Sequence, residues 1–110
     1  MLDAYSVSIQ LIRLVRPLVE RIAKHDRDLA DQIRRAMNSI PLNLSEGRKS
    51  RGGNQTRLYS YACGSNDEVR AGLESALAWE WIEEAEEALA LVDRLAAMTW
   101  RLTHPRRSAA

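Results

Sequence analysis

The 110-residue chain contains no phenylalanine, and it has only five glycines, three prolines and one cysteine. The low numbers of glycine and proline argue against a sheet built from hairpins, because hairpin turns depend on these residues. The single cysteine, Cys63, cannot form an internal disulfide, so we expect a reducing compartment. No apolar run approaches the roughly 20 residues that span a bilayer, and residues 1–5 lack the features of a signal peptide. We therefore expect a cytoplasmic protein.

Motifs for enzymatic chemistry are also missing. Metal sites inside helical bundles use Glu-x-x-His pairs, and neither His25 nor His104 follows a glutamate by three residues. Cys63 has no histidine near it in the sequence, and we expect a packed, unreactive thiol. Gly52-Gly53 lacks the flanking pattern of a phosphate-binding loop. The sequence therefore predicts a non-enzymatic protein without metal or cofactor, in which both histidines are solvated or cap helix ends.

The chain is instead rich in alanine, leucine, arginine and glutamate, which favour helices. Apolar residues recur at helical spacing in four segments that are separated by short polar connections. These segments are residues 5–24, 28–48, 54–79 and 83–103. They predict one domain over residues 1–110, an all-α, antiparallel up-and-down four-helix bundle. Residues 106–110 are expected to form a frayed tail.

Polar residues at the helix starts are candidate N-caps, since their side-chain oxygens can accept hydrogen bonds from first-turn N–H groups. The candidates are Asp3 or Ser6 for the first helix, Asp26 or Asp28 for the second, and Asn54 for the third. The run Ser65-Asn66-Asp67-Glu68 also fits a capping box that would start a new helix after Gly64. We expect one continuous helix instead, because an apolar stripe that includes Tyr61 and Ser65 keeps its phase on both sides of Gly64.

The segment Ser39–Gly47 stands out within the second predicted helix. Pro41 removes one backbone hydrogen bond, which costs roughly 3 kcal/mol in a helix interior, and frees the carbonyl group of Met37. We expect a kink here, with a polar side chain or water as the new partner of that carbonyl group. Gly47 is expected to end this helix in a left-handed conformation. Pro17 is expected to bend the first helix. The structural motif of the segment is Pro41, Asn43, Glu46 and Gly47.

Charge is distributed unevenly along the chain. Residues 1–57 contain eleven basic and six acidic residues, whereas residues 58–110 contain five and nine. The candidate nucleic-acid-binding residues are Arg34, Arg35, Arg48, Lys49, Arg51 and Arg57. Guanidinium groups bind phosphates, and a cluster of them would give salt-dependent, sequence-tolerant binding. No aromatic residue lies within residues 48–57, so base stacking is not expected. Solvated helix faces and loops explain the same charges equally well.

The three tryptophans are candidate oligomer-interface residues. Trp79 and Trp81 are predicted on opposite faces, so they cannot both enter one core, and Trp100 lies off the apolar stripe of the last helix. Large aromatic side chains displaced from a core often anchor subunit contacts. Partial burial within one subunit is the alternative.

Three parts of the chain carry a resemblance to a known family. They are Gln32–Ala36 leading into Ser39–Gly47, the basic loop with Ser50, and Ala62–Ser65 with Glu68 and Leu73. In these parts the chain resembles the small bacterial four-helix-bundle proteins first noticed as reading frames in intervening sequences of 23S ribosomal RNA genes. One departure concerns the last connection. Where the family usually has Leu-Gly-Tyr-Ile, this chain has Trp79-Glu80-Trp81-Ile82, so a glutamate replaces the turn glycine.

The resemblance implies a homo-oligomer, a ring of five subunits. Accessory variability proteins of diversity-generating retroelements are similar in fold; they pair with a reverse transcriptase and bind nucleic acid through basic surfaces. By this resemblance we expect an accessory protein whose basic rim, repeated around the ring, holds RNA or DNA beside a larger enzyme such as a reverse transcriptase. The alternative is a scaffold without a nucleic-acid role, in which basic residues of one subunit pair with the acidic start of the last helix in the next.

Overall fold

The computed structural model describes residues 3–105, which form four α-helices and contain no strand. The helices are α1 (Ala4–Ala23), α2 (Arg27–Arg48), α3 (Gly52–Ala78) and α4 (Glu86–Thr103). The all-α prediction is therefore confirmed for this part of the chain, and every helix end lies within three residues of its predicted position. The predicted tail, residues 106–110, lies outside the described residues.

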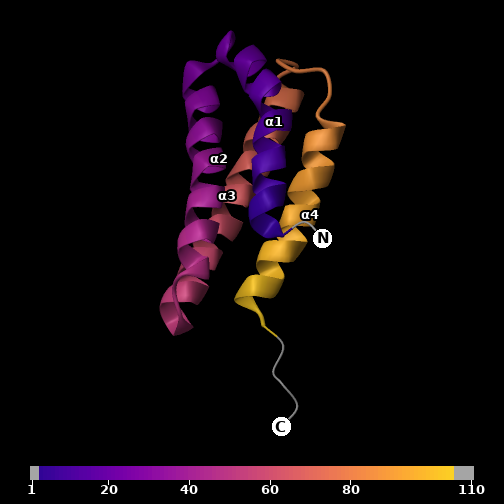
Figure 1. The fold of residues 1–110 in the computed structure, drawn as a ribbon. Helices are drawn as coiled ribbons and strands as arrows, with labels where there is room; N and C mark the ends of the chain where they lie inside the picture. Colours follow the sequence, from indigo (N-terminus) through magenta and orange to yellow (C-terminus); the bar gives the residue numbers. More distant parts are fainter. Residues whose placement is uncertain (1–2, 106–110) are drawn as a thin grey trace.

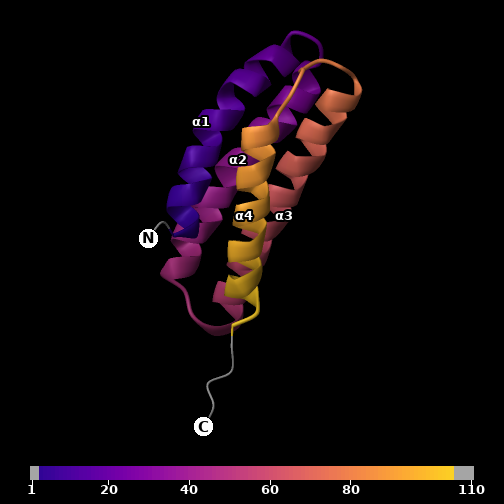
Figure 2. The same ribbon diagram turned by 90° about the vertical axis from the view of Figure 1, so that its right-hand side faces the viewer.

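Consecutive helices pack against each other along the chain, and α1 also packs against α4. The α1–α2 and α3–α4 connections lie at one end of the molecule, and the α2–α3 connection lies at the other end, near the end of α4 (Figures 1 and 2). At that end, α2 and α3 extend beyond the start of α1 (Figures 1 and 2). The ends of α2 and α4 and the start of α3 therefore share one pole of the molecule. Within residues 3–105, no helix has the length and apolar character needed to cross a membrane.

One stripe of each helix supplies the core. In α1 the almost fully buried apolar residues are Val7, Leu11, Val15, Val19 and Ile22, which recur every three or four positions. The stripe of α3 differs from the predicted one. Tyr59 and Asn66 face the core, whereas Tyr61 is exposed and Ser65 is only half-buried. The apolar residues of α3 are not concentrated on one face of the helix. The packing of α3 against α2 therefore decides which of its residues are buried.

The observed caps confirm two of the predicted alternatives and exclude a third prediction. Asp3 accepts a hydrogen bond from the Ser6 amide at 2.8 Å, and Asp26 accepts one from the Leu29 amide at 2.9 Å. Asn54, predicted to cap α3, instead lies within its first turn and donates to Ser50 Oγ. The helix begins earlier, at Gly52, whose positive φ of 59° is one that glycine adopts without strain. As predicted, α3 runs through Gly64 without a break.

Both prolines inside helices are accommodated without interrupting them. Pro17 is exposed on α1, and Pro41 is buried on the core side of α2. The polar side chain after Pro41 that makes new hydrogen bonds is Asn43, whose Nδ2 donates to the Ser39 carbonyl and to Ser39 Oγ, both at 2.8 Å. Asn43 thus donates to Ser39 and not to the carbonyl group of Met37, which was the predicted acceptor.

Gly47 does not provide the predicted left-handed end of α2. It is buried inside the helix, and the residue that follows the helix, Lys49, has a right-handed conformation with φ −91° and ψ −6°. A Cβ atom at Gly47 would lie 2.5 Å from Cε1 of Tyr59 and 2.8 Å from Cδ1. The glycine is therefore needed for the close approach of α3, and it makes room for the buried Tyr59 ring.

A methyl group at Gly47 is expected to destabilise the fold. Gly47→Ala should lower the free energy of unfolding by about 1–3 kcal/mol, because the new Cβ atom forces Tyr59 to move within a packed core. The matched control is Gly64→Ala, since a Cβ atom there would meet nothing within 4 Å. Replacing this mid-helix glycine should raise the stability by roughly 0.5–1 kcal/mol. Urea denaturation of both variants measures the difference. An equal change in stability, of the same sign, in the two variants would contradict the close-approach argument.

The connection between α3 and α4 places its two tryptophans together, so the prediction of opposite faces is wrong. The rings of Trp79 and Trp81 stack with centroids 5.6 Å apart and an interplanar angle of 11°. Trp81 also stacks on His25, at 5.8 Å. The helix ends at Ala78, and Glu80 between the two tryptophans has a positive φ of 62°. Helical spacing therefore does not apply across this turn, and both rings turn to the same side.

The left-handed conformation of Glu80 destabilises the fold, whereas glycine would adopt it without strain. Glu80→Gly is expected to raise the free energy of unfolding by roughly 1 kcal/mol, because the left-handed region is unfavourable for residues with a Cβ atom. Glu83→Gly is the control, since Glu83 lies in the same exposed connection and has no positive φ. That variant should be no more stable than the parent protein. Thermal or urea unfolding that ranks the two variants in the reverse order would refute this account of the turn.

Candidate nucleic-acid interface

Four of the six predicted basic residues lie at the α2–α3 connection. Arg48 ends α2, Lys49 follows it, Arg51 precedes the first residue of α3, and Arg57 lies in the second turn of α3. All four side chains are exposed. The structure therefore brings these predicted residues to one end of the molecule.

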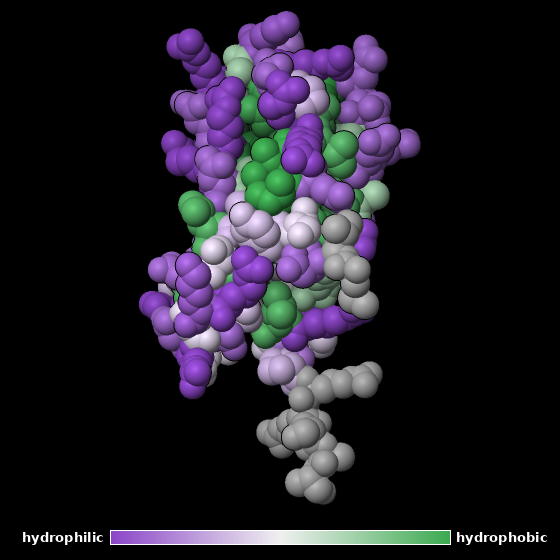
Figure 3. All heavy atoms as spheres, viewed as in Figure 1, coloured by the Kyte–Doolittle hydropathy of each residue, from purple (hydrophilic) through white to green (hydrophobic). Residues whose placement is uncertain are grey.

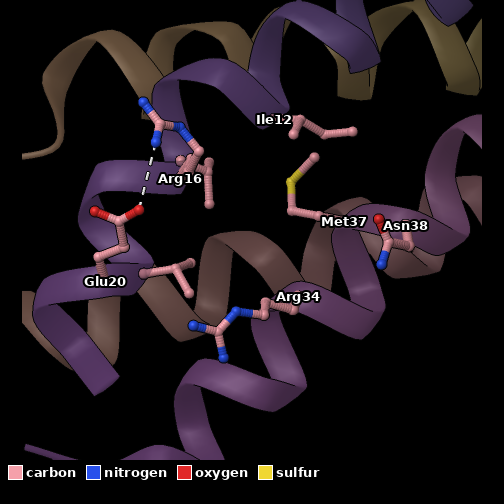
Figure 4. Close-up of a pocket in the computed structure, with 8 residues that line it drawn as sticks. Ile12, Arg16, Glu20, Arg34, Met37 and Asn38 are labelled. Atoms are coloured by element: carbon pink, nitrogen blue, oxygen red, sulfur yellow. Dashed lines mark hydrogen bonds and ion pairs between the residues drawn. The ribbon is translucent and has the colours of Figure 1, made fainter. Parts of the chain in front are cut away.

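The other two predicted residues, Arg34 and Arg35, lie elsewhere. They precede Arg48 by 14 and 13 positions on the same helix, which corresponds to roughly 20 Å along its axis. Arg34 forms an ion pair with Asp31 at 2.9 Å and lines a pocket of about 240 Å³ between α1 and α2. In Figure 4 it lies across this pocket from Arg16, which is paired with Glu20 at 3.4 Å. The six predicted residues thus form two separate groups.

A basic residue that sequence reasoning missed belongs to the first group. Arg101 lies in the last turn of α4, which ends at the same pole as α2 (Figure 2). Arg101 and Arg48 line the same pocket. The alternation of helix directions was a usable signal, because it places the ends of α2 and α4 together. We call the resulting group the basic pole, and it consists of Arg48, Lys49, Arg51, Arg57 and Arg101.

One acidic residue interacts directly with the basic pole. Asp3 Oδ2 lies 3.7 Å from Arg48 Nη1, which is a loose and exposed ion pair. The pKa of Asp3 is lowered from its usual 3.8, first by the hydrogen bond from the Ser6 amide, then by the Ser6 side chain, and less by Arg48. Nearby, the N-terminus of α3 has no side-chain cap, so its first-turn N–H groups add positive potential beside Arg51.

Aromatic rings lie beside the basic pole, although none occurs within residues 48–57. The guanidinium carbon of Arg48 lies 4.9 Å from the centre of the Tyr5 ring, and that of Arg57 lies 5.8 Å from the centre of the Tyr61 ring. Tyr61 is 52% exposed. The Arg57–Tyr61 pair was available from sequence, since the two residues are four apart on one helix. The Arg48–Tyr5 pair was not, because it joins two helices.

Almost the whole chain matches one known protein family. Residues 1–101 match the model of the family described as 23S rRNA-intervening sequence protein. The chain belongs to this family. The resemblance carried by Ser39–Gly47 and Ala62–Ser65 is thereby confirmed over almost the whole sequence. Comparisons with curated proteins and with solved structures found no match.

The other candidate residues of this 23S rRNA-intervening sequence protein do not form a single site. Trp79 is 65% exposed and Trp81 is half-buried at the end opposite the basic pole, whereas Trp100 is 56% exposed in the last turn of α4. His104 stacks on Trp100 with centroids 4.1 Å apart. Both histidines lie at helix ends, as predicted, and Cys63 is a half-buried free thiol. Among residues 3–105, no group of three potential metal ligands occurs.

The contact between Asp3 and Arg48 should have a measurable effect on the pKa of Asp3. Because folding lowers the pKa of Asp3, its charged form stabilises the fold above pH 3.8, and this contribution is lost as the pH falls through the lower folded-state pKa. Arg48→Gln should raise the pKa of Asp3 part of the way to its usual value, since the Ser6 hydrogen bonds remain. NMR titration of the Asp3 carboxyl carbon measures this shift. Arg51→Gln removes the same charge nearby and should leave the pKa unchanged; equal shifts in the two variants would contradict a specific contact.

Proposed function

We propose that this protein is a non-enzymatic, homo-oligomeric accessory factor that binds RNA or DNA through its basic pole, without sequence specificity. In this proposal the subunit is an antiparallel up-and-down bundle, and the subunits form a ring, by resemblance a pentamer, in the cytoplasm. A larger nucleic-acid enzyme, such as a reverse transcriptase, is the proposed partner. The observation that carries the proposal is the convergence of basic side chains from α2, α3 and α4 at one end of the subunit.

Charge at the basic pole favours a polyanion. Five basic residues gather there, and the acidic residues in the adjoining helix ends are Asp3 and Glu46. Asp3 is already the N-cap of α1, so its carboxylate is shared between Ser6 and Arg48. Arginine and lysine side chains and the N–H groups at helix N-termini are among the groups that contact phosphate oxygens. Binding through such contacts depends on the backbone of the nucleic acid and tolerates any sequence.

Assembly would strengthen this interaction. A ring presents the same basic pole several times on one side, so contacts that are weak singly act together on one strand. Exposed apolar side chains support assembly, since Leu42, Trp79 and Trp100 are 68%, 65% and 56% exposed. Tryptophan is enriched among the residues that anchor protein–protein contacts. Trp79, Trp81 and Trp100 therefore remain our proposed interface residues.

The same exposed tryptophans favour a second candidate function, a scaffold without nucleic acid. In that case the basic pole of one subunit pairs with Glu83, Glu84 and Glu87 of the next, and salt changes the oligomer instead of a ligand complex. Charge reversal at the three glutamates should then dissociate the assembly in light scattering. An intact assembly after this change would exclude the scaffold version.

Nucleic-acid binding is tested by anisotropy with labelled single-stranded RNA or DNA at increasing salt. We expect binding at about 50 mM salt and a steep loss of affinity, with a log–log slope of about −4 if six phosphates are neutralised. Reversing Arg48, Lys49 and Arg51 to glutamate should weaken binding on the order of 100-fold or more, because charges that neutralised phosphates now repel them.

The matched control reverses three exposed arginines far from the basic pole, Arg13, Arg21 and Arg27. It changes the net charge by the same amount and should weaken binding much less. Absence of binding at low salt would overturn the proposed function, as would equal losses in the two triple variants.

A further inference from the structure

A second feature of the same end of the molecule is a pocket of about 310 Å³ that opens beside the start of α1. Residues of all four helices line it, and α1 begins short of the ends of α2 and α4 (Figures 1 and 2). On the face shown in Figure 3, a patch of apolar atoms is visible near this end, with polar atoms around it. The lining residues are Asp3, Ala4, Tyr5, Leu44, Arg48, Tyr59, Met98, Arg101 and Leu102.

The floor of the pocket is apolar. Leu44 is 2% exposed and Tyr59 is 7% exposed, so both belong to the core, while Leu102 is 36% exposed at the opening. Met98 also lines the pocket and is half-buried. Pockets of this size with mostly apolar walls and a few convergent polar groups are typical of small-ligand sites. The floor therefore suits a hydrocarbon body.

The opening of the pocket is positively charged. The charged residues that line it are two arginines, Arg48 and Arg101, and one aspartate, Asp3. The Asp3–Arg48 distance of 3.7 Å is too long for a strong hydrogen bond, and the other oxygen of Asp3 accepts from the Ser6 amide. Within residues 3–105, Arg101 makes no ion pair. The opening therefore favours an anionic group at the end of an apolar body.

The pocket volume limits how much of that body can be enclosed. A water-sized unit occupies about 30 Å³, so a pocket of about 310 Å³ holds roughly ten such units. A methylene group is of similar size, so the volume corresponds to a chain of about eight to ten carbons.

We propose that this pocket binds a medium-chain fatty-acid carboxylate, with its chain against Leu44, Tyr59, Met98 and Leu102 and its carboxylate between Arg48 and Arg101. The guanidinium groups supply charge-assisted hydrogen bonds to the carboxylate, and burial of the chain supplies most of the affinity. This site goes beyond the proposed function and does not depend on it, since the pocket lies within one subunit. Both sites use Arg48 and Arg101, so nucleic acid and the carboxylate would compete for these two side chains.

Titration of the full chain with saturated fatty acids of six to fourteen carbons, below their micelle concentrations, tests the proposal by calorimetry. Affinity should rise on the order of four-fold per methylene and level off at about ten carbons, where the pocket is full. Decyltrimethylammonium has a ten-carbon chain with the opposite charge and should bind at least ten-fold more weakly than decanoate. A steady rise through fourteen carbons, or equal binding of the two head groups, would indicate adsorption to general apolar surface and overturn the site.

Matched variants locate the site. Arg101→Gln should weaken decanoate binding on the order of ten-fold, whereas Arg94→Gln, two turns earlier on α4 and outside the pocket, should not change it. Leu102→Ser should weaken decanoate, but Leu42→Ser should not, since Leu42 is exposed on α2 outside the pocket. All four replacements are at exposed positions, so the fold should persist. Equal effects within either pair would refute the assignment.

Discussion

The packing of α2 against α3 depends on two places where one helix presents no side chain to the other. At Gly47 a Cβ atom would lie 2.5 Å from the Tyr59 ring, and at Gly72 it would lie 2.6 Å from Cγ1 of Ile33. Between these contacts, Ser65 Oγ donates to Ser39 Oγ at 2.9 Å. The three contacts fix both the separation and the register of the two helices. Because Gly47 directly precedes Arg48, the same packing decides where the basic residues of α2 meet those of α3.

The helices themselves could be predicted from the sequence, because apolar residues at three- and four-residue intervals and aspartates at helix starts act locally. The residues that were misplaced depend on a neighbouring element. Tyr59 is buried in place of Tyr61 because Gly47 on another helix leaves space for it. Trp79 and Trp81 stack because the residue between them is left-handed, and nothing in their spacing reveals that. The candidate site shows the same division. The basic residues of 48–57 could be predicted from local charge. The position of Arg101 and Tyr5 beside them depends on which helix ends meet.

A polar contact inside the core connects α4 to α3. Asn66 is completely buried on α3, and its Nδ2 donates to the carbonyl group of Val92 on α4 at 3.0 Å. Its Oδ1 has no hydrogen-bond partner among the described residues. A buried amide stabilises less than an apolar side chain of the same shape, but it is satisfied best in one register of the two helices. Asn66 therefore contributes to the alignment of α4 with α3, and through it to the position of Arg101.

The extension of α2 and α3 beyond the start of α1 has a dynamic consequence. The backbone hydrogen bonds of this projecting tip are shielded by fewer neighbours than those in the middle of the molecule, so the tip can open locally while the core stays folded. Amide protons there should exchange with solvent faster than those around Leu11 or Val92, which are fully buried. A polyanion bound across the tip would hold it closed. Part of the binding free energy would then be spent on ordering the tip, and occupancy would register as slower exchange at residues that never touch the ligand.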